Sequence, residues 1–317
     1  MKGEPPKALI YGPVPSRRLG YSLGLDILPF KTCSMDCIYC QLGAYGRTTD
    51  RRREYVPVRA VLAQIRGALA SGARIDAITF SGSGEPTLHA GIGRIIAGIK
   101  RMTDVKVVVL TNSSTLAGRR NGRDLVQADI VVPSLDAVTD RIFAKVNRPH
   151  AGLTAEKIID GLVRFRRRFK GRIWLEVMLV RGINDGPAHL RRLRAAIERI
   201  RPDRVQINTV VRPPAEKSAR PLTAAELERV RIFLGPTAEI IADFSREKQP
   251  VPAPDASAAI LAALKRRPMT AGDLSQSLGL VVEEVLALTR RLTVAGAIRK
   301  VAHSGNAYFE PAPTSKG

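Results

Sequence analysis

The stretch Cys33-Ser34-Met35-Asp36-Cys37-Ile38-Tyr39-Cys40 contains the only three cysteines of a 317-residue chain. Thiolates hold iron–sulfur clusters, and a cubane cluster usually takes four of them. Three cysteines therefore predict a 4Fe-4S cluster in which one iron has no protein ligand and is open to chemistry. We interpret Cys33, Cys37 and Cys40 as the metal ligands and as the catalytic centre.

Two other uses of these cysteines remain open at this point. Structural zinc takes four protein ligands in tetrahedral geometry, and the nearest histidine, His89, lies in a different part of the chain. A disulfide would leave one odd thiol, and nothing in the sequence indicates an oxidising compartment. The sequence favours the cluster over both alternatives.

Short apolar segments alternate with helical segments around and after this stretch. Strands are expected at 22–29, 75–80, 105–110, 130–132, 173–180 and 204–210, and helices at 58–70, 91–101, 154–169 and 187–200. Such alternation predicts right-handed βαβ units and a parallel sheet. An eightfold barrel needs about 250 residues, but only about 220 are present before a proline-rich break. The predicted fold class is therefore α/β, with a partial (βα)6 barrel.

The break is Lys248-Gln-Pro-Val-Pro-Ala-Pro254, which can continue neither a helix nor a central strand. Beyond it the sequence predicts three helices and a hairpin, which together indicate a winged helix-turn-helix. Thr270 and Gly279 have the residue types that begin and end the second of these helices. We therefore expect a barrel over 1–247, a linker over 248–255 and a winged-helix-like domain over 256–317.

The C-x3-C-x2-C spacing, with the aromatic Tyr39 before the last cysteine, resembles the signature of the radical S-adenosylmethionine (SAM) superfamily. Two flanking segments, Gly12-Pro-Val-Pro-Ser-Arg-Arg-Leu-Gly20 and Ser22-Leu-Gly-Leu-Asp-Ile27, resemble a branch of Fe-S oxidoreductases related to wyosine-type tRNA-modifying enzymes. The resemblance implies a partial barrel in which SAM chelates the open iron and is cleaved to a 5'-deoxyadenosyl radical. The wyosine-forming enzymes carry further cysteines for a second cluster, and this chain has none.

Polar residues follow most of the expected strands, at the edge where barrel enzymes carry their functional groups. Gly82-Ser-Gly-Glu-Pro86 resembles the Gly-Gly-Glu-Pro motif of the superfamily, with Ser83 replacing a glycine. The resemblance assigns a contact with the SAM ammonium to Ser83, Gly84 and Glu85, and contacts with other parts of SAM to Tyr39, Asn112, Ser134 and Asp136. The alternatives are that Glu85 lies at a helix start and that Asn112 and Asp136 cap helices.

Glu176 shares a face of its expected strand with Trp174 and Met178, so its carboxylate should point into the barrel. An unpaired carboxylate there would cost several kcal/mol, so it needs a ligand or a partner. Arg181, at the end of the same strand, is expected either to pair with Glu176 or to hold the SAM carboxylate.

The net charge of +22 favours polyanionic partners. Basic clusters occur at 51–53, 164–172 and 191–194, although each could be a solvated helix face. We expect an RNA substrate, with tRNA as the candidate, and an electron donor such as flavodoxin or ferredoxin. The alternatives are a protein or metabolite substrate, or an Fe-S sensor with a DNA-binding winged helix. No signal-like N-terminus or apolar run of about 18 residues is present, so we expect a cytoplasmic protein without membrane contacts.

Overall fold

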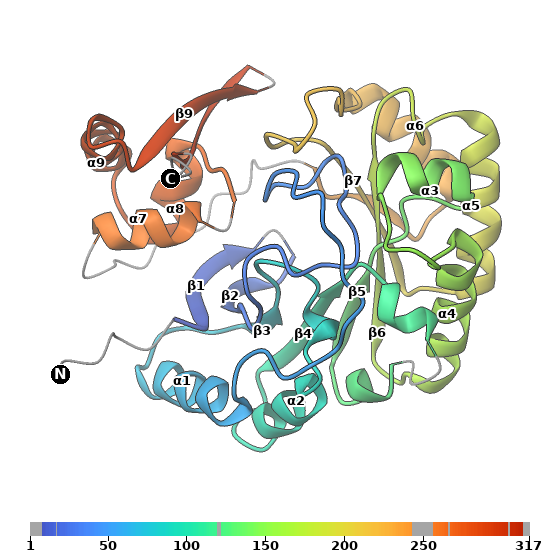
Figure 1. Ribbon diagram of the computed structural model, residues 1–317, viewed down its shortest axis with the longest axis horizontal. Helices are drawn as coiled ribbons and strands as arrows, with labels where there is room; N and C mark the ends of the chain where they lie inside the picture. Colours follow the sequence, from blue (N-terminus) through green and yellow to red (C-terminus); the bar gives the residue numbers. More distant parts are fainter. Residues whose placement is uncertain are drawn as a thin grey trace.

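The computed structural model describes residues 8–16, 18–118, 122–242, 256–265, 267–303 and 305–312. Its main feature is an eight-stranded sheet whose strands are adjacent in chain order (Figure 1). Strand β1 (Ile10–Ser16) pairs antiparallel with β2 (Gly20–Leu25), and all later neighbours are parallel. The parallel series continues with β3 (Ala77–Phe80), β4 (Lys106–Thr111), β5 (Ile130–Pro133), β6 (Arg172–Leu179), β7 (Arg204–Thr209) and β8 (Ala238–Ile240).

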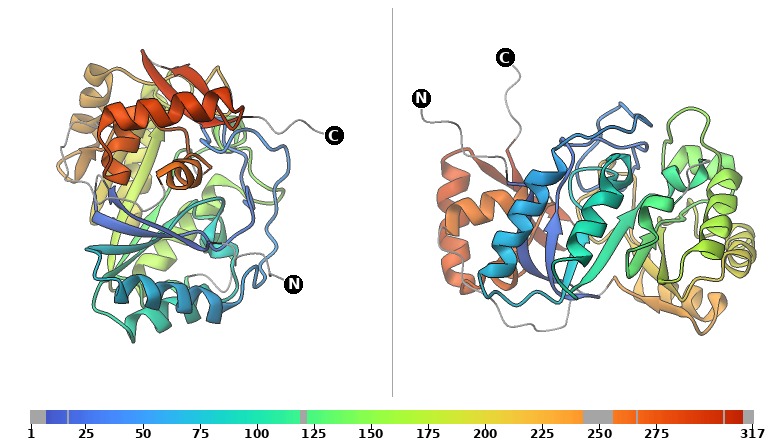
Figure 2. Two further views of the ribbon diagram at one scale, coloured as in Figure 1. Left: turned by 90° about the vertical axis from the view of Figure 1, so that its left-hand side faces the viewer. Right: turned by 90° about the horizontal axis from the view of Figure 1, so that it is seen from below.

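Helices cover the outer face of the curled sheet (Figures 1 and 2). They are α1 (Val58–Ala70), α2 (Ile92–Lys100), α3 (Asp140–Val146), α4 (Ala155–Arg168), α5 (Pro187–Ile200) and α6 (Ala224–Leu234). Alternate strand residues such as Ile78, Leu175 and Ile207 pack with these helices in one apolar core. Within the described part of the chain, no helix is long and apolar enough to cross a bilayer.

The expected parallel α/β sheet is confirmed, but the expected number of strands was too small. The structure adds β1 and β8, one at each edge of the sheet. Strand β1 includes Gly12, Pro13 and Pro15, a composition typical of a loop that an edge strand nevertheless tolerates. Strand β8 is only three residues long, so its sequence carries little periodic signal. Since β1 and β8 do not pair with each other within the described residues, the barrel is open.

The concave face of the sheet has an apolar layer near the amino ends of its strands. This layer contains Ala77, Val108, Ile130, Val132 and Trp174. Polar side chains lie at the same level of the sheet. Ser22 is paired with Ala77 and Thr79 with Val108, and the hydroxyl oxygens of Ser22 and Thr79 are 2.7 Å apart. The barrel interior therefore contains both apolar and polar side chains.

The C-terminal unit, residues 256–312, has its own apolar core. It consists of α7 (Ala256–Leu264), α8 (Ala271–Leu278), α9 (Val282–Val294) and the antiparallel strands β9 (Ile298–His303) and β10 (Asn306–Pro311). Thr270 caps α8 in a reciprocal arrangement with Asp273, and Gly279 ends the helix with a positive φ of 72°, as the sequence predicts. The predicted linker, 248–255, lies outside the described residues.

The C-terminal unit contacts the barrel at three consecutive residues after β7. His303 Nε2 lies 3.0 Å from the carbonyl oxygen of Val210, and the Tyr308 hydroxyl donates to that of Val211 over 2.6 Å. Buried Arg212 donates to the carbonyl oxygen of Pro268 over 3.0 Å. Helix α8 also contacts edge strand β1, so the unit lies beside the open side of the barrel (Figure 1).

Candidate functional site

The cysteine loop, residues 26–57, connects β2 to α1 over the carboxyl ends of the strands (Figure 1). It has little regular structure, so contacts with distant segments fix its path. The amides of Asp36 and Ile38 donate to backbone carbonyls at the end of α3, and the amide of Glu85 donates to the carbonyl of Thr32 over 2.9 Å. The loop therefore joins the segments that follow β3 and β5.

Each cysteine sulfur faces a nitrogen donor. Asn112 Nδ2 lies 3.4 Å from Cys33 Sγ, and Asn147 Nδ2 lies 3.4 Å from Cys37 Sγ. The ammonium of Lys31 is close enough to interact with Cys40. Amide and ammonium groups at these positions would stabilise negative charge on the sulfurs.

Without metal, the surroundings of Cys33 and Cys37 favour the protonated form of these two thiols. Burial, with a contribution from the nearby carboxyl of Glu85, raises the pKa of Cys33 to about 12. Burial and the carboxyl of Asp136 raise the pKa of Cys37. Because metal ligation requires thiolates, binding of a cluster must release these protons.

The arrangement of the thiols suits a cluster better than a single ion. Within the part of the chain that the structure describes, no three or more His, Cys, Asp or Glu side chains converge on one metal position. Structural zinc needs such convergence. The three thiolates of a cubane instead bind three different irons, so neighbouring thiols with separate donors fit that group.

Asp136 lies at the centre of a buried hydrogen-bond network next to Cys37. Its carboxylate accepts from the Tyr39 hydroxyl, from Asn147 Nδ2 at 2.7 Å and from the Met178 amide at 2.9 Å. The capping alternative for Asp136 is wrong, because α3 begins at Asp140 with Thr139 as its N-cap. Burial raises the pKa of Asp136, although these hydrogen bonds oppose the rise.

Four of the predicted cofactor-binding residues line one small pocket. They are Tyr39, Asn112, Ser134 and Asp136. Asn147 lines the same pocket, and its buried Oδ1 has no hydrogen-bond partner among the described residues. Sequence reasoning assigned no role to Asn147, because it follows α3 instead of a strand. Its only signal was a similarity of the segment Asn147-Arg-Pro149 to the same family branch.

Glu85 lies at a helix start, as one interpretation of the sequence expected. It is the N-cap of the 3-10 helix η1 (Pro86–Leu88). One carboxylate oxygen accepts from the amide and hydroxyl of Thr87 and from the hydroxyl of Thr111, and the other accepts from the amide of Asn112 at 2.6 Å. Burial raises the pKa of Glu85 against these hydrogen bonds. Glu85 thus ties β4 to the segment after β3, and its contact with SAM stays a prediction.

Ser83 and Gly84 pack closely against the segment around the start of the cysteine loop. The amide and hydroxyl of Ser83 donate to the carboxylate of Asp26 at 3.0 and 2.6 Å. A Cβ atom on Gly84 would lie 2.1 Å from the carbonyl oxygen of Thr32, so only glycine fits there. The segment is therefore held next to the cysteines, and the contact of Ser83 and Gly84 with SAM remains a prediction.

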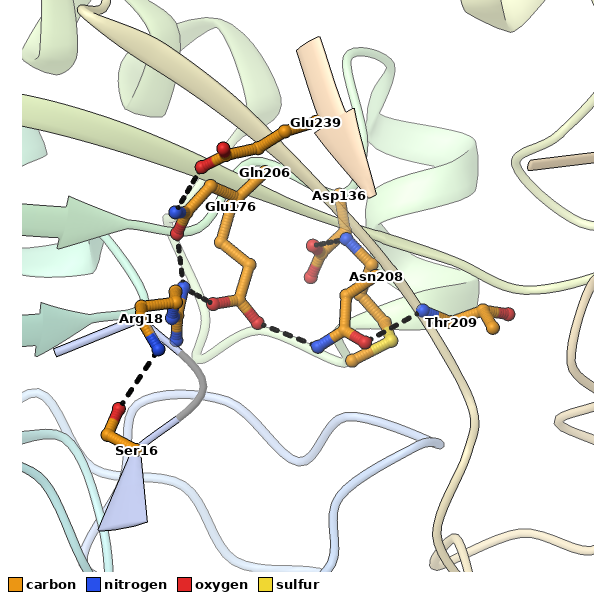
Figure 3. Close-up of polar contacts among 9 residues, drawn as sticks. Ser16, Arg18, Asp136, Glu176, Gln206, Asn208, Thr209 and Glu239 are labelled. Carbon is orange, nitrogen blue, oxygen red and sulfur yellow. Dashed lines mark hydrogen bonds and ion pairs between the residues drawn. The ribbon is translucent and has the colours of Figure 1, made fainter. Parts of the chain in front are cut away.

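Glu176 has partners inside the barrel, but Arg181 is not one of them. Glu176 Oε2 pairs with Arg18 Nη1 at 2.7 Å, and Oε1 accepts from Asn208 Nδ2 at 3.2 Å (Figure 3). Arg181 instead pairs with Glu226 on the surface, at 2.7 Å. The expected pairing of Glu176 with Arg181 is therefore wrong, because the backbone after β6 carries Arg181 out of the barrel.

Arg18 was missed by sequence reasoning, although it lies in the quoted segment 12–20. Its guanidinium also contacts Gln206 on β7, which in turn donates to Glu239 on β8 at 2.8 Å (Figure 3). The turn between β1 and β2 thus reaches the strands at the opposite side of the sheet. This network shows directly that the sheet curls into a partial barrel.

The three arginine clusters lie on different parts of the molecule. Residues 51–53 belong to the cysteine loop, whereas 164–172 connect the end of α4 to the start of β6, at the opposite edge of the sheet. Residues 191–194 lie on α5, in the outer helix layer. The clusters therefore lie on three different segments of the fold, and residues 51–53 belong to the loop that carries the cysteines.

Comparisons with known proteins agree on the family. The sequence profile described as the Radical SAM superfamily matches residues 27–194, which is 168 of the 317 residues. A UPF0026 protein of Helicobacter pylori strain 26695 is 34% identical over 235 residues, covering 73% of this chain and 75% of that protein. A protein named GTPase Obg of Brachyspira hyodysenteriae is 41% identical over 224 residues, which cover 71% of this chain but only 33% of that protein.

More distant relatives include an RNA-modifying enzyme and a solved methyltransferase structure. The dual-specificity RNA methyltransferase RlmN of Syntrophotalea carbinolica is 24% identical over 210 residues, covering 64% of this chain and 53% of that protein. A radical SAM methyltransferase from Sphaerobacter thermophilus has the same fold, with a TM-score of 0.51 and 18% identity over 69% of this chain and 66% of that one. The chain therefore belongs to the radical SAM superfamily, whose enzymes use a 4Fe-4S cluster and S-adenosylmethionine.

Proposed function

We propose that this radical SAM enzyme modifies a base in RNA, with tRNA as the first candidate. The observation that carries the radical chemistry is the position of the cysteines. Cys33 and Cys37 each face an asparagine amide, beside a pocket lined by Tyr39, Ser134 and Asp136. When bound, the cluster supplies the electron that cleaves SAM to the 5'-deoxyadenosyl radical. The protein residues bind SAM, orient it and hold the cluster.

We assign different roles in SAM binding to the residues of the pocket. Ser134 lies at the exit of β5 and is proposed to contact the ribose of SAM. Asp136 already accepts three hydrogen bonds, so it is proposed to fix the Tyr39 ring and the Asn147 amide at the ribose side of the site. Asn147 Oδ1 is an acceptor without a partner among the described residues and can receive a hydrogen bond from a SAM hydroxyl or ammonium group.

Three observations support RNA over other substrates. The net charge is +22, which favours binding of a phosphate backbone. The relative RlmN is named as an RNA methyltransferase, and the N-terminal motifs resemble the wyosine-related branch. Arg47 and Arg51 are exposed on the cysteine loop, on the side of the barrel where substrate would approach the radical.

We also propose that the chain has two domains, a barrel over 1–247 and a winged-helix-like domain over 256–317. The separate apolar core and the helix and hairpin composition of residues 256–312 support this division. Because the C-terminal unit is fixed to the exit of β7, we propose that it helps to seat the substrate beside the mouth of the barrel. Flavodoxin or ferredoxin is the proposed electron donor.

The decisive experiment for this function is a comparison of modified nucleosides in RNA from a wild-type and a deletion strain. A nucleoside mass that is lost in the deletion strain, and restored by the gene but not by a Cys37→Ala variant, would support the proposal. Unchanged nucleosides in all RNA fractions would indicate that the substrate is a protein or a metabolite. That result would leave the radical SAM assignment intact.

A further inference from the structure

The tip of the cysteine loop displays aromatic and basic side chains to solvent. Tyr45 and Phe30 are 53% and 54% exposed, although large apolar rings are usually more buried. Arg47 and Arg51 are exposed nearby in the sequence. Within the described residues, neither guanidinium has a hydrogen-bond or ion-pair partner. The tip, defined as residues 43–47, therefore exposes the ring of Tyr45 and the guanidinium of Arg47 together.

The tip is held in place by buried charged groups. Lys31 and Asp36 are 3% and 6% exposed and lie 3.3 Å apart. Lys31 Nζ donates to the Gly43 carbonyl at 2.6 Å, and the Asp36 carboxylate accepts from the amides of Tyr45 and Gly46 at 3.2 and 2.9 Å. Gly43 and Gly46 have positive φ, as this turn requires.

This anchoring has a cost that core packing does not explain. Burying two charges is unfavourable unless each is well paired, and apolar residues would fill the same volume at least as well. Lys31 also faces Cys40, but among the described residues the hydrogen bonds that Lys31 and Asp36 make to the backbone converge on the exposed tip. Lys31 and Asp36 lie on either side of the ligand Cys33 in sequence, so their hydrogen bonds connect the tip to the segment that carries this cysteine.

We propose that this tip is a docking platform for an unpaired RNA nucleotide, with Tyr45 as the stacking surface and Arg47 as a phosphate contact. This inference rests on the proposed RNA substrate and specifies how it is recognised. Proteins bind unpaired RNA bases by stacking them on exposed aromatic rings next to cationic side chains. An acidic protein partner would use the arginines, but it would not require a solvent-exposed ring on a fixed turn.

The test uses full-length protein, reconstituted without oxygen, and two RNA oligonucleotides of equal length. One forms a stem with an unpaired loop and the other is fully duplex. Affinity is measured by fluorescence anisotropy at several salt concentrations. Tyr45→Leu removes the π face at a site where the side chain is exposed, and Tyr45→Trp keeps it. Phe233→Ala is the matched control, since Phe233 is an exposed ring next to Arg194 on the outer helix layer.

We expect Tyr45→Leu to weaken binding of the stem-loop by about 5-fold to 150-fold, the range for loss of one stacked base. Tyr45→Trp and Phe233→Ala should bind like the wild type, and the duplex should be little affected by any of them. Arg47→Ala should lower the salt slope by about 0.7, one single-strand phosphate contact, whereas Tyr45→Leu should leave the slope unchanged.

Three different failures are distinguishable. If the wild type binds the stem-loop but Tyr45→Leu binds equally well, the platform is wrong and the RNA function stands. If the wild type binds neither RNA at any salt concentration, the docking platform and the proposed RNA function are both wrong. Slower reduction of the cluster by an acidic flavodoxin in the Tyr45 and Arg47 variants, with RNA binding intact, would assign the tip to the electron donor and overturn the platform.

Discussion

Arg212 offers a sharp test of how the C-terminal unit is attached to the barrel. Its side chain is buried, donates to the Pro268 carbonyl at 3.0 Å and lies 3.8 Å from the carboxylate of Asp273. Arg212→Met keeps most of the volume and removes the charge and the donors. A hydrogen bond from a charged group contributes about 1.5–3 kcal/mol, and breaking a buried ion pair costs about 3–5 kcal/mol.

The expected loss lies at the lower end of that range. The carboxylate of Asp273 still accepts from the Thr270 amide in the variant, and 3.8 Å is a long ion pair, so this carboxylate is not left without a partner. We therefore expect the free energy of unfolding to fall by about 2–4 kcal/mol. For a chain of 317 residues each kcal/mol corresponds to about 1.5 °C in Tm, so the expected fall is about 3–6 °C.

The assay is thermal unfolding of the variant beside a matched control. Arg181→Met removes an arginine at the exit of the neighbouring strand, where its pair with Glu226 is 42% and 32% exposed. Such a surface pair contributes about 0–1 kcal/mol, so Tm should change little. Equal, small shifts in the two variants would show that the contact at Arg212 does not hold the unit in place, and would refute this account of its attachment.

Three further predictions concern the site and its acid sensitivity. Asn147→Ala removes the donor to Cys37, so the reduction potential of the reconstituted cluster should fall in a redox titration followed by electron paramagnetic resonance. Glu85→Gln places an NH2 group against donors, so Tm should fall by an amount equivalent to about 1–3 kcal/mol and SAM binding should weaken in a titration. Burial lowers the pKa of His89 and His189, so protonation favours the unfolded chain. Their stabilisation is full above the ordinary histidine pKa of about 6.5, and Tm should drop as pH falls below it.

Each of these predictions has a contrary outcome. An unchanged potential in Asn147→Ala would mean that its amide does not act on the cluster. Asn184→Ala is its control, since that buried amide bonds to the carbonyls of Asp136 and Met178 and not to sulfur. Normal SAM affinity in a destabilised Glu85→Gln would restrict Glu85 to its capping role. A flat profile of Tm between pH 8 and 5 would contradict the assignment to buried neutral histidines.

The regular part of the fold could be predicted because its signals are local. Helices α1 and α5 have the predicted bounds, since both have clear helical periodicity and α5 begins with Pro187 at its first position. Strands β1 and β8 could not be predicted, because an edge strand with prolines and a three-residue strand lack the strand pattern. Their places in the sheet depend on pairing with β2 and β7.

Only those site residues that directly follow a strand could be predicted from the sequence. Asn112, Ser134 and Asp136 follow neighbouring parallel strands, so topology alone brings them together. Glu176 was recognised as needing a partner, but the arginine at the end of the same strand, Arg181, was chosen. The true partner, Arg18, is 158 residues away and reaches Glu176 only because the sheet curls. The curvature of the sheet could not be predicted from a local sequence pattern, so the contact between Arg18 and Glu176 could not be predicted either.

The most direct test of the central claim is the metal content of the anaerobically reconstituted protein. We predict about four irons and four acid-labile sulfides per chain, as one cubane requires, and the loss of this content in a variant lacking Cys33, Cys37 and Cys40. The reduced wild type should then cleave SAM to 5'-deoxyadenosine. One tightly bound zinc per chain with no acid-labile sulfide would contradict the account.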